Sequence, residues 1–248
     1  MISAEKRGAL SLQIEVIGVI HSCYTEKFGI PRQPGMVASA TAYLELYPAY
    51  NREEMLRSLT QFSHIWVHFL FHEIVGDGWK PTVRPPWLGG KKRVGVFATR
   101  SPHRPNHLGL SVVRLREIVY EEGRFLLKLS GIDFLDQSPV IDIKPYIPYS
   151  DVVSSATCGY ARGRQADIAV FFSDLAEEFC LDYEKRTGRT LRLLIAELLA
   201  QDPRPASQKK NKNSFAIRLW DVNIKWRVEK DYFQVVECCS DISEPKSK

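Results

Sequence analysis

Residues 93–110 read RVGVFATRSPHRPNHLGL, an apolar run followed at once by a cationic segment with two prolines. The β-branched and aromatic residues at 94–98 predict a short buried strand. Pro102 and Pro105 lack backbone donors and fix φ, so residues 101–109 are predicted to form a stiff, exposed loop. The residues that tolerate left-handed backbone in it are Asn106 and Gly109. The side chains that give the segment its charge are Arg100, His103, Arg104 and His107. Such a loop predicts a binding surface, with a merely solvated basic loop as the alternative.

The basic segment, residues 80–116, concentrates positive charge in a chain whose net charge is only +5. It has nine Lys or Arg residues and no Asp or Glu, so the remainder of the chain is net acidic. The aromatic residues that flank or interrupt these cations are Trp79, Trp87 and Phe97. Phosphate contacts combined with base stacking favour a single-stranded or looped nucleic acid as partner. The residues that we expect to contact RNA are Lys91, Lys92, Arg93, His103 and Arg104.

A membrane or an acidic protein are the other partners that a basic surface could bind. The segment contains no basic amphipathic helix, and the chain has neither an apolar run of 18 residues nor a lipidation motif, which argues against a membrane. Residues 1–10 lack the apolar core of a secretory signal. Five cysteines without a CxxC pair are typical of reduced thiols. We therefore expect a cytoplasmic protein.

Three histidines at every fourth position invite a metal interpretation. His64, His68 and His72 lie in the run SHIWVHFLFHEI, where every second residue forms the series His64, Trp66, His68, Leu70 and His72. This period of two predicts a strand with the three histidines on one face. A structural zinc ion needs a closed tetrahedral set of ligands, which this run alone does not supply. We therefore predict no metal site.

Short strands at regular spacing predict an antiparallel sheet or barrel, followed by a smaller part with two helices. With 248 residues, 44% of them hydrophobic, the chain can bury one large core or two small ones. In the first part, residues 12–150, the expected strands are 12–20, 39–46, 64–71, 93–98, 111–120, 124–131 and 139–144, with one helix at 52–59. Pro145 and Pro148 mark the boundary. In the second part, residues 151–238, we expect helices 167–186 and 190–200 and strands 215–228 and 232–238, before a disordered tail at 239–248.

Five ordered blocks of the chain resemble the TsaA-like family. They are GVIHSCYTEKFGIPRQPG (18–35), FSHIWVHFLFHE (62–73), RPPWLGG (84–90), GVFATRSPHRPNHLGLS (95–111) and GIDFLDQSPVIDIKPYIPYSD (131–151). DPRPA (202–206) and LWDVNIKWRV (219–228) resemble the C-terminal domain of its bacterial members. The resemblance implies a single-sheet β-barrel and a tRNA (adenine-N6)-methyltransferase that uses S-adenosylmethionine. It also implies a homodimer with the cofactor near its interface. The implied substrate is N6-threonylcarbamoyladenosine at position 37, next to the anticodon.

The same resemblance implies which residues contact the cofactor. They are Gln33, Pro34, Gly35, His72, Glu73, Arg100, Leu110, Asp133, Phe134, Leu135 and Asp136. A sulfonium cation needs nearby negative charge or aromatic surface, which the carboxylates of this set could supply. Asp142 is equally well explained as a strand carboxylate paired with Lys144 or Arg114. The positions that depart from the family pattern are Glu73, His107 and Ser207.

Two other functions remain open from the residues alone. One is a barrel that binds RNA or a metabolite without catalysis, as other small barrels do. The other is a metal-dependent hydrolase built on the histidines, which lacks a ligand set. Proton loss from N6 during methyl transfer would call for a histidine or a carboxylate as base, and the sequence does not identify it.

Overall fold

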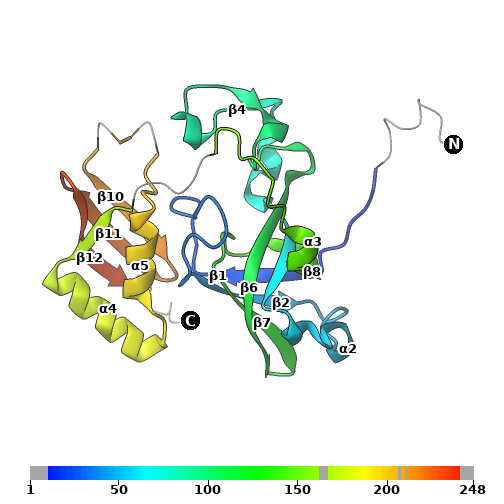
Figure 1. Cartoon of the computed structure of the whole chain (residues 1–248). Helices are drawn as coiled ribbons and strands as arrows, with labels where there is room; N and C mark the ends of the chain where they lie inside the picture. Colours follow the sequence, from blue (N-terminus) through cyan, green and yellow to red (C-terminus); the bar gives the residue numbers. More distant parts are fainter. Residues whose placement is uncertain (1–10, 162–166, 206–207, 210–211, 241–248) are drawn as a thin grey trace.

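Six strands of the computed structural model close into an antiparallel barrel (Figure 1). The structure describes residues 11–161, 167–205, 208–209 and 212–240. The order around the barrel is β1-β2-β7-β6-β3-β8. The bounds of these strands are Gly18–Ser22 (β1), Thr41–Leu46 (β2), His64–Leu70 (β3), Leu108–Glu121 (β6), Arg124–Ser130 (β7) and Pro139–Pro145 (β8). The short helices of this part are α2 (Glu53–Leu56) and α3 (Pro148–Asp151). The predicted barrel is therefore confirmed, although its first strand starts later than residue 12.

Strand β3 shows how the sequence pattern builds the barrel. Ile65, Val67 and Phe69 are buried inside, and the residues between them face outward. The predicted alternation is confirmed for His64 and His68. His72 lies beyond the strand, in the 3₁₀ helix η2 (His72–Asp77). A two-residue turn at 122–123 joins the end of β6 to the start of β7, and both of its residues have positive φ.

The predicted strand at 94–98 is wrong beyond its first two residues. Only Val94–Gly95 (β5) pairs, with Thr82–Val83 (β4), and Val96–Ala98 forms a 3₁₀ helix. Prolines at 81, 85 and 86 flank the partner strand and cannot donate to a longer ladder. The 3₁₀ helix leaves the Phe97 side chain 78% exposed instead of buried.

The second part is a four-stranded sheet with the order β10-β11-β12-β9 and two packed helices. Its elements are β9 (Ala169–Phe172), α4 (Asp174–Thr187), α5 (Leu191–Ala200), β10 (Ser214–Leu219), β11 (Val222–Val228) and β12 (Tyr232–Ser240). Both predicted helices form, but the first begins later than predicted because residues 169–172 pair with β12. Ser173 accepts a hydrogen bond from Ala176 N at 3.3 Å and so marks the start of α4.

Two other sequence boundaries need correction in this part. The predicted single strand at 215–228 is a hairpin, because Trp220 adopts φ 52° and reverses the chain. Strand β12 also continues through residues 239–240, which were assigned to a disordered tail. The rest of that tail, 241–248, lies outside the described residues.

The two parts share one continuous core. Tyr24 forms an isolated β-bridge with Leu219, and Trp220 N donates to Cys23 O at 2.9 Å. Phe28 stacks on Trp226 with ring centroids 6.1 Å apart. The chain between β1 and β2, residues 23–40, is therefore held against the second part.

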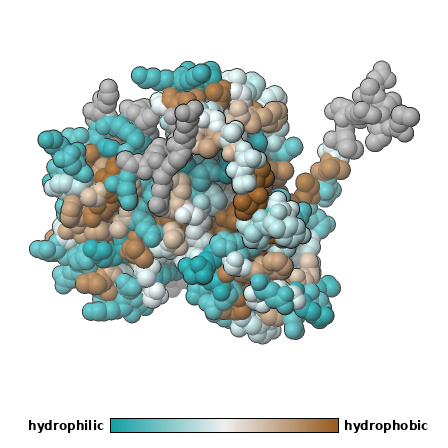
Figure 2. Space-filling model, in the orientation of Figure 1, coloured by the Kyte–Doolittle hydropathy of each residue, from teal (hydrophilic) through white to brown (hydrophobic). Residues whose placement is uncertain are grey.

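One face of the molecule is a mosaic of hydrophilic and hydrophobic residues (Figure 2). Within the described residues, no helix combines the length and the apolar character needed to span a bilayer.

Candidate functional site

A cavity of about 670 Å³ opens at one end of the barrel. Its lining comes from the connection β1–β2, the end of β3 with η2, the loop before β6 with the start of that strand, and the connection β7–β8. In this antiparallel barrel, all of these segments meet at the same rim. Residues far apart in the sequence therefore converge on one cavity, whose size is typical of a site for a small organic molecule.

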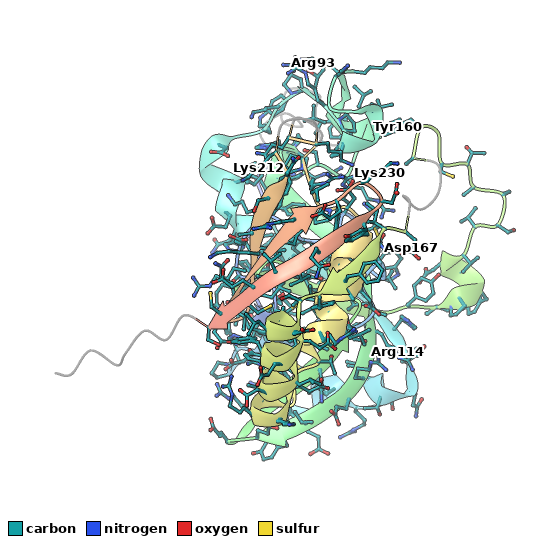
Figure 3. The ribbon with its side chains drawn as sticks, turned by 90° about the vertical axis from the view of Figure 1, so that its left-hand side faces the viewer. Arg93, Arg114, Tyr160, Asp167, Lys212 and Lys230 are labelled. Atoms are coloured by element: carbon teal, nitrogen blue, oxygen red, sulfur yellow. The ribbon has the colours of Figure 1, made fainter. Side chains whose placement is uncertain are left out.

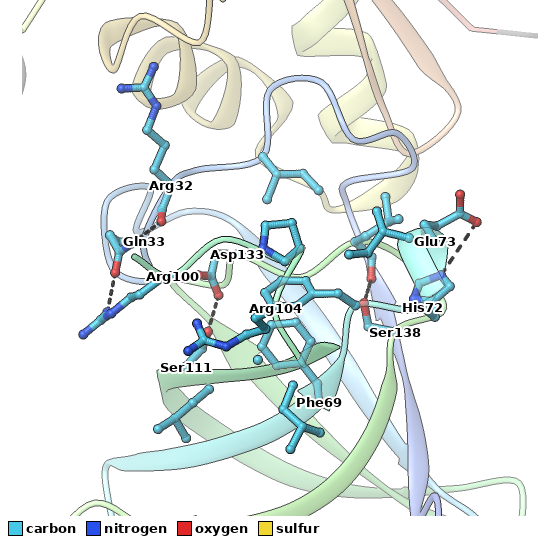
Figure 4. Close-up of a pocket in the computed structure, with 18 of the residues that line it drawn as sticks. Arg32, Gln33, Phe69, His72, Glu73, Arg100, Arg104, Ser111, Asp133 and Ser138 are labelled. Atoms are coloured by element: carbon cyan, nitrogen blue, oxygen red, sulfur yellow. Dashed lines mark hydrogen bonds and ion pairs between the residues drawn. The ribbon is translucent and has the colours of Figure 1, made fainter. Parts of the chain in front are cut away.

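One wall of the cavity carries a carboxylate between polar and cationic side chains (Figure 4). Ser111 Oγ donates to Asp133 Oδ1 at 2.7 Å. Burial raises the pKa of Asp133 to about 6, although the Ser111 hydrogen bond and the Arg100 charge oppose the rise. Arg100 donates to the side-chain oxygen of Gln33. In Figure 4 the Arg104 guanidinium also points toward this carboxylate.

The opposite wall carries His72 and Glu73 of η2 (Figure 4). Lys27, from the β1–β2 connection, also lines the cavity. Lys27 Nζ donates to Glu73 O at 3.0 Å and lies 3.5 Å from Glu73 Oε2. His72 Nε2 lies 3.9 Å from the other carboxylate oxygen of Glu73. Lys27 thus connects two rim segments and neutralises the acidic residue on this side.

The cationic loop before β6 has a fixed shape because its backbone groups are hydrogen-bonded. Lys80 N donates to His103 O at 3.0 Å, and Phe71 N donates to His107 O at 2.9 Å. Asn106 has φ 65°, as predicted for a residue tolerant of left-handed backbone. Most of the loop is half-buried, so the prediction of an exposed loop is wrong for most of its residues.

Gly109 has a different role from the predicted one. It is a buried residue of β6 without positive φ, and a Cβ there would lie 2.3 Å from Phe69 Cζ. A glycine at this position therefore leaves room for the Phe69 ring, which lines the cavity. Phe69 also packs edge-on against Phe134, with ring centroids 4.9 Å apart.

The structure brings most of the predicted cofactor residues together. Those that line the cavity are Gln33, His72, Glu73, Arg100, Leu110, Asp133 and Leu135. Pro34, Gly35, Phe134 and Asp136 do not line it. Phe134 is fully buried in the core. The Asp136 side chain accepts from Ser22 N at 2.8 Å, so it fixes the barrel rim instead of facing the cavity.

The predicted RNA-contacting residues separate into two groups. Lys91, Lys92 and Arg93 are exposed and lie away from the cavity. His103 and Arg104 are half-buried, and Arg104 lines the cavity. The aromatic residues Trp79 and Phe97 of the same region are 59% and 78% exposed.

Sequence reasoning missed several residues of the cavity. They are Lys27, Arg32, His68, Leu108 and Ser111, among others. Leu108 and Leu110 share one face of β6 and are both exposed, although they are hydrophobic. Alternation along residues 108–111 could have indicated this face, but Ser111 could not have been paired with Asp133 without the fold. Ser207, one of the departures from the family pattern, lies outside the described residues.

The described part of the chain contains no candidate metal site. No group of three or more His, Cys, Asp or Glu side chains is placed there to hold a metal ion. The five cysteines are free thiols.

A closed barrel whose cavity is lined by two carboxylates and four cationic side chains, next to the basic segment, is typical of proteins that bind a small charged molecule beside a polyanion. Residues 19–152 match the model of the tRNA-methyltransferase O N-terminal domain, and residues 165–241 match that of the TrmO C-terminal domain. The chain belongs to the tRNA-methyltransferase O (TrmO) family.

Individual relatives agree with this assignment. The chain is 47% identical to a tRNA (adenine(37)-N6)-methyltransferase of Escherichia coli, over 91% of this chain and 97% of the relative. It is 47% identical to a putative S-adenosylmethionine-dependent methyltransferase of Pseudomonas aeruginosa, over 86% of this chain and 91% of the relative. The crystal structure of TrmO from P. aeruginosa superposes with a TM-score of 0.79 at 39% identity, covering 94% of this chain and all of that one.

Proposed function

We propose that this protein transfers a methyl group from S-adenosylmethionine to N6 of the adenine at position 37 of tRNA. We propose further that this adenine is already N6-threonylcarbamoylated, so that the product is its N6-methyl derivative. The observation that carries the proposal is the cavity, in which a buried carboxylate lies among cations beside the exposed basic segment. The names of the relatives support the same activity.

The residues of the cavity fit the chemical groups of S-adenosylmethionine, which supplies an electrophilic methyl group when bound. Asp133, with a pKa of about 6, is mostly ionised at neutral pH and would face a cationic sulfonium or amino group. Arg100 would face the carboxylate of the amino-acid end. Phe69, Leu108 and Leu110 provide apolar surface for an adenine ring.

The excess of cations supports the carbamoylated substrate. The cations that line the cavity are Lys27, Arg32, Arg100 and Arg104, against the carboxylates Glu73 and Asp133. S-adenosylmethionine brings one carboxylate, whereas a threonylcarbamoyl group brings a second one. A cavity with net positive charge therefore favours the modified adenine over the unmodified one.

The reaction requires orientation and the loss of one proton. Holding the acceptor nitrogen in line with the methyl group can lower the activation barrier by about 7–11 kcal/mol through proximity and orientation. The N6 proton must then leave, and an ionisable group near the cavity can accept it. The histidines and carboxylates that line the cavity and can serve this purpose are His68, His72, Glu73 and Asp133.

The proposed function is tested by calorimetric titration with S-adenosylmethionine and by methyl transfer to two tRNA preparations. One preparation carries threonylcarbamoyladenosine at position 37, and the other is an unmodified transcript of the same sequence. We expect binding of the cofactor and methylation of the modified tRNA only. Cofactor binding without transfer to either tRNA would instead support a binding module, and equal transfer to both would contradict the specificity.

Charge reversal at the exposed tip of the basic segment is expected to weaken tRNA binding. Lys91→Glu with Lys92→Glu should raise the KM for tRNA and reduce the slope of log KM against log salt, because two phosphate contacts are lost. The affinity for S-adenosylmethionine should stay the same, because neither lysine lines the cavity. Steady-state kinetics at several salt concentrations measure both effects.

The control for this prediction places the same charge change elsewhere on the barrel. Arg52→Glu with Arg57→Glu alters two exposed cations around α2, at the end of the barrel away from β4 (Figure 1). The KM for tRNA should stay close to that of the unmodified protein. An unchanged KM in the Lys91/Lys92 variant at about 0.1 M salt, where the Debye length is near 10 Å, would mean that this segment does not contact tRNA.

We also propose that the protein acts as a homodimer in the cytoplasm, where its tRNA substrate is available. Leu108 and Leu110 are hydrophobic residues 40% and 47% exposed at the cavity mouth, which supports a covering surface from a second copy. Analytical ultracentrifugation should detect a dimer under assay conditions. A fully active monomer would contradict this part of the proposal.

A further inference from the structure

The sheet of the second part has one covered and one open face. Phe215, Ile217 and Trp226 are buried on the face that packs against α4, α5 and the 23–40 connection. The alternate residues of β10 and β11 are exposed on the other face. The two helices that contact this sheet, α4 and α5, pack on its covered face, where their buried residues share the core with Phe215, Ile217 and Trp226.

A row of polar and aromatic side chains crosses the open face. The strand registers place Ser214 opposite Arg227, Arg227 opposite Gln234, and Gln234 opposite Phe171. The Phe171 ring lies edge-on to that of Tyr232, with centroids 5.1 Å apart. The two aromatic residues are 54% and 36% exposed. Exposed aromatic rings beside an arginine and an amide, on the open face of a sheet, are typical of surfaces on which unpaired RNA bases stack.

The charge of this region favours a polyanion. Residues 209–227 contain six Lys or Arg and a single acidic residue, Asp221, whose carboxylate accepts from Tyr183 OH at 2.6 Å. Lys209 is paired with Asp202 at 2.7 Å and Lys225 with Glu237 at 2.9 Å, so these two lysines contribute less than the other cations. The following turn, in which Lys230 lies between Glu229 and Asp231, is net negative, so the excess of positive charge is confined to residues 209–227.

One end of this surface lies toward the end of the molecule that carries the basic segment. In Figure 3, Lys212 and Lys230 of the second part lie toward the same end as Arg93. Tyr160, from the chain that connects the two parts, donates to Ala98 O at 2.6 Å and also lies at this end. One extended RNA can therefore contact both regions.

We propose that the open face around Phe171, Arg227 and Tyr232 is a second tRNA-binding surface, which holds the tRNA while its position-37 base occupies the cavity. The aromatic pair stacks on unpaired bases, and Arg227 contacts phosphate. This inference rests on the proposed function only in taking tRNA as the substrate.

Binding of a fluorescently labelled tRNA, measured by anisotropy at 0.1 M salt without S-adenosylmethionine, tests the inference. Phe171→Ala with Tyr232→Ala should weaken the Kd about tenfold, the loss expected for one stacked base. Arg227→Glu should weaken it by a similar factor and reduce its salt dependence. In both variants the KM for tRNA should rise while kcat and the affinity for S-adenosylmethionine stay unchanged.

Lys185→Glu is the matched control, because it reverses one exposed cation on α4, on the covered side of the same sheet. Its Kd for tRNA should stay within twofold of the unmodified protein. Unchanged tRNA affinity in the Phe171/Tyr232 and Arg227 variants, with an unmodified protein that binds and methylates tRNA, would overturn this inference alone. An unmodified protein that does not bind tRNA would overturn the proposed function as well.

Discussion

Asp133→Asn is expected to weaken the binding of S-adenosylmethionine on the order of 100-fold and to reduce methyl transfer at least as much. The substitution keeps the shape of the side chain and removes its charge. Losing one partner of a desolvated charge pair costs about 2–5 kcal/mol, and each 1.4 kcal/mol is a factor of ten. Calorimetric titration measures the binding and a single-turnover assay measures the transfer.

The pH dependence gives this prediction an independent readout. The pKa of Asp133 is raised to about 6, so the carboxylate becomes protonated as the pH falls through 6. The affinity of the unmodified protein for the cationic cofactor should therefore fall below pH 6, whereas that of Asp133→Asn should not change there. A raised pKa also means that ionising Asp133 opposes folding, so the variant should not be less stable at pH 7.

Asp142→Asn is the matched control, because Asp142 pairs with Lys144 at 3.3 Å on the barrel wall, outside the cavity. It should leave both binding and transfer unchanged. If Asp133→Asn binds S-adenosylmethionine within threefold of the unmodified protein, Asp133 does not contact the cofactor.

Asp202→Ala is expected to lower the free energy of unfolding by about 3–5 kcal/mol, the effect of breaking a buried ion pair on one side. Arg204 donates to both carboxylate oxygens of Asp202, at 2.7 and 3.0 Å, and only 9% of Arg204 is exposed. Lys209 donates to the same carboxylate at 2.7 Å. Without Asp202, the Arg204 guanidinium would remain buried without its counterion. Urea unfolding followed by circular dichroism measures the loss.

Acid should remove the same stabilisation. Burial alone would raise the pKa of Asp202, but the hydrogen bonds from Arg204 and Lys209 outweigh it and lower the pKa below its usual value. The stabilisation is therefore present at neutral pH and is lost as the pH falls through the lowered pKa. Asp182→Ala, which breaks an exposed pair with Arg186, should cost less than about 1 kcal/mol. Equal losses in the two variants would contradict the prediction.

The sequence predicted those features of the fold that depend on local alternation. The period of two in residues 64–70 identified β3 correctly because one face of that strand is buried. The strand predicted at 94–98 is only two residues long because its length depends on its partner, residues 82–83. Prolines flank that partner and end the ladder, and they are distant in sequence from residues 94–98. The helix predicted from 167 failed at its start because residues 169–172 satisfy either period, and only pairing with β12 decides between them.

The site was predictable in part for a similar reason. Resemblance and charge pointed to Asp133 and Arg100, which both line the cavity. They also pointed to Asp136, but its carboxylate accepts a hydrogen bond from Ser22 N. Ser22 is distant in the sequence, so this contact cannot be predicted without the fold. Contacts between segments, such as Lys27 with Glu73, become visible only when the barrel brings the rim together.

The turn at Glu122–Gly123 offers a practical attachment point. It joins β6 to β7 at the end of the barrel opposite the cavity, and its residues take φ 49° and 81°. A dye or a biotin-bearing peptide inserted there would lie a full strand length from the rim, because β6 runs over 14 residues between them. The protein could be tethered to a surface by this turn, with the cavity and the basic segment facing the solution for single-molecule measurements.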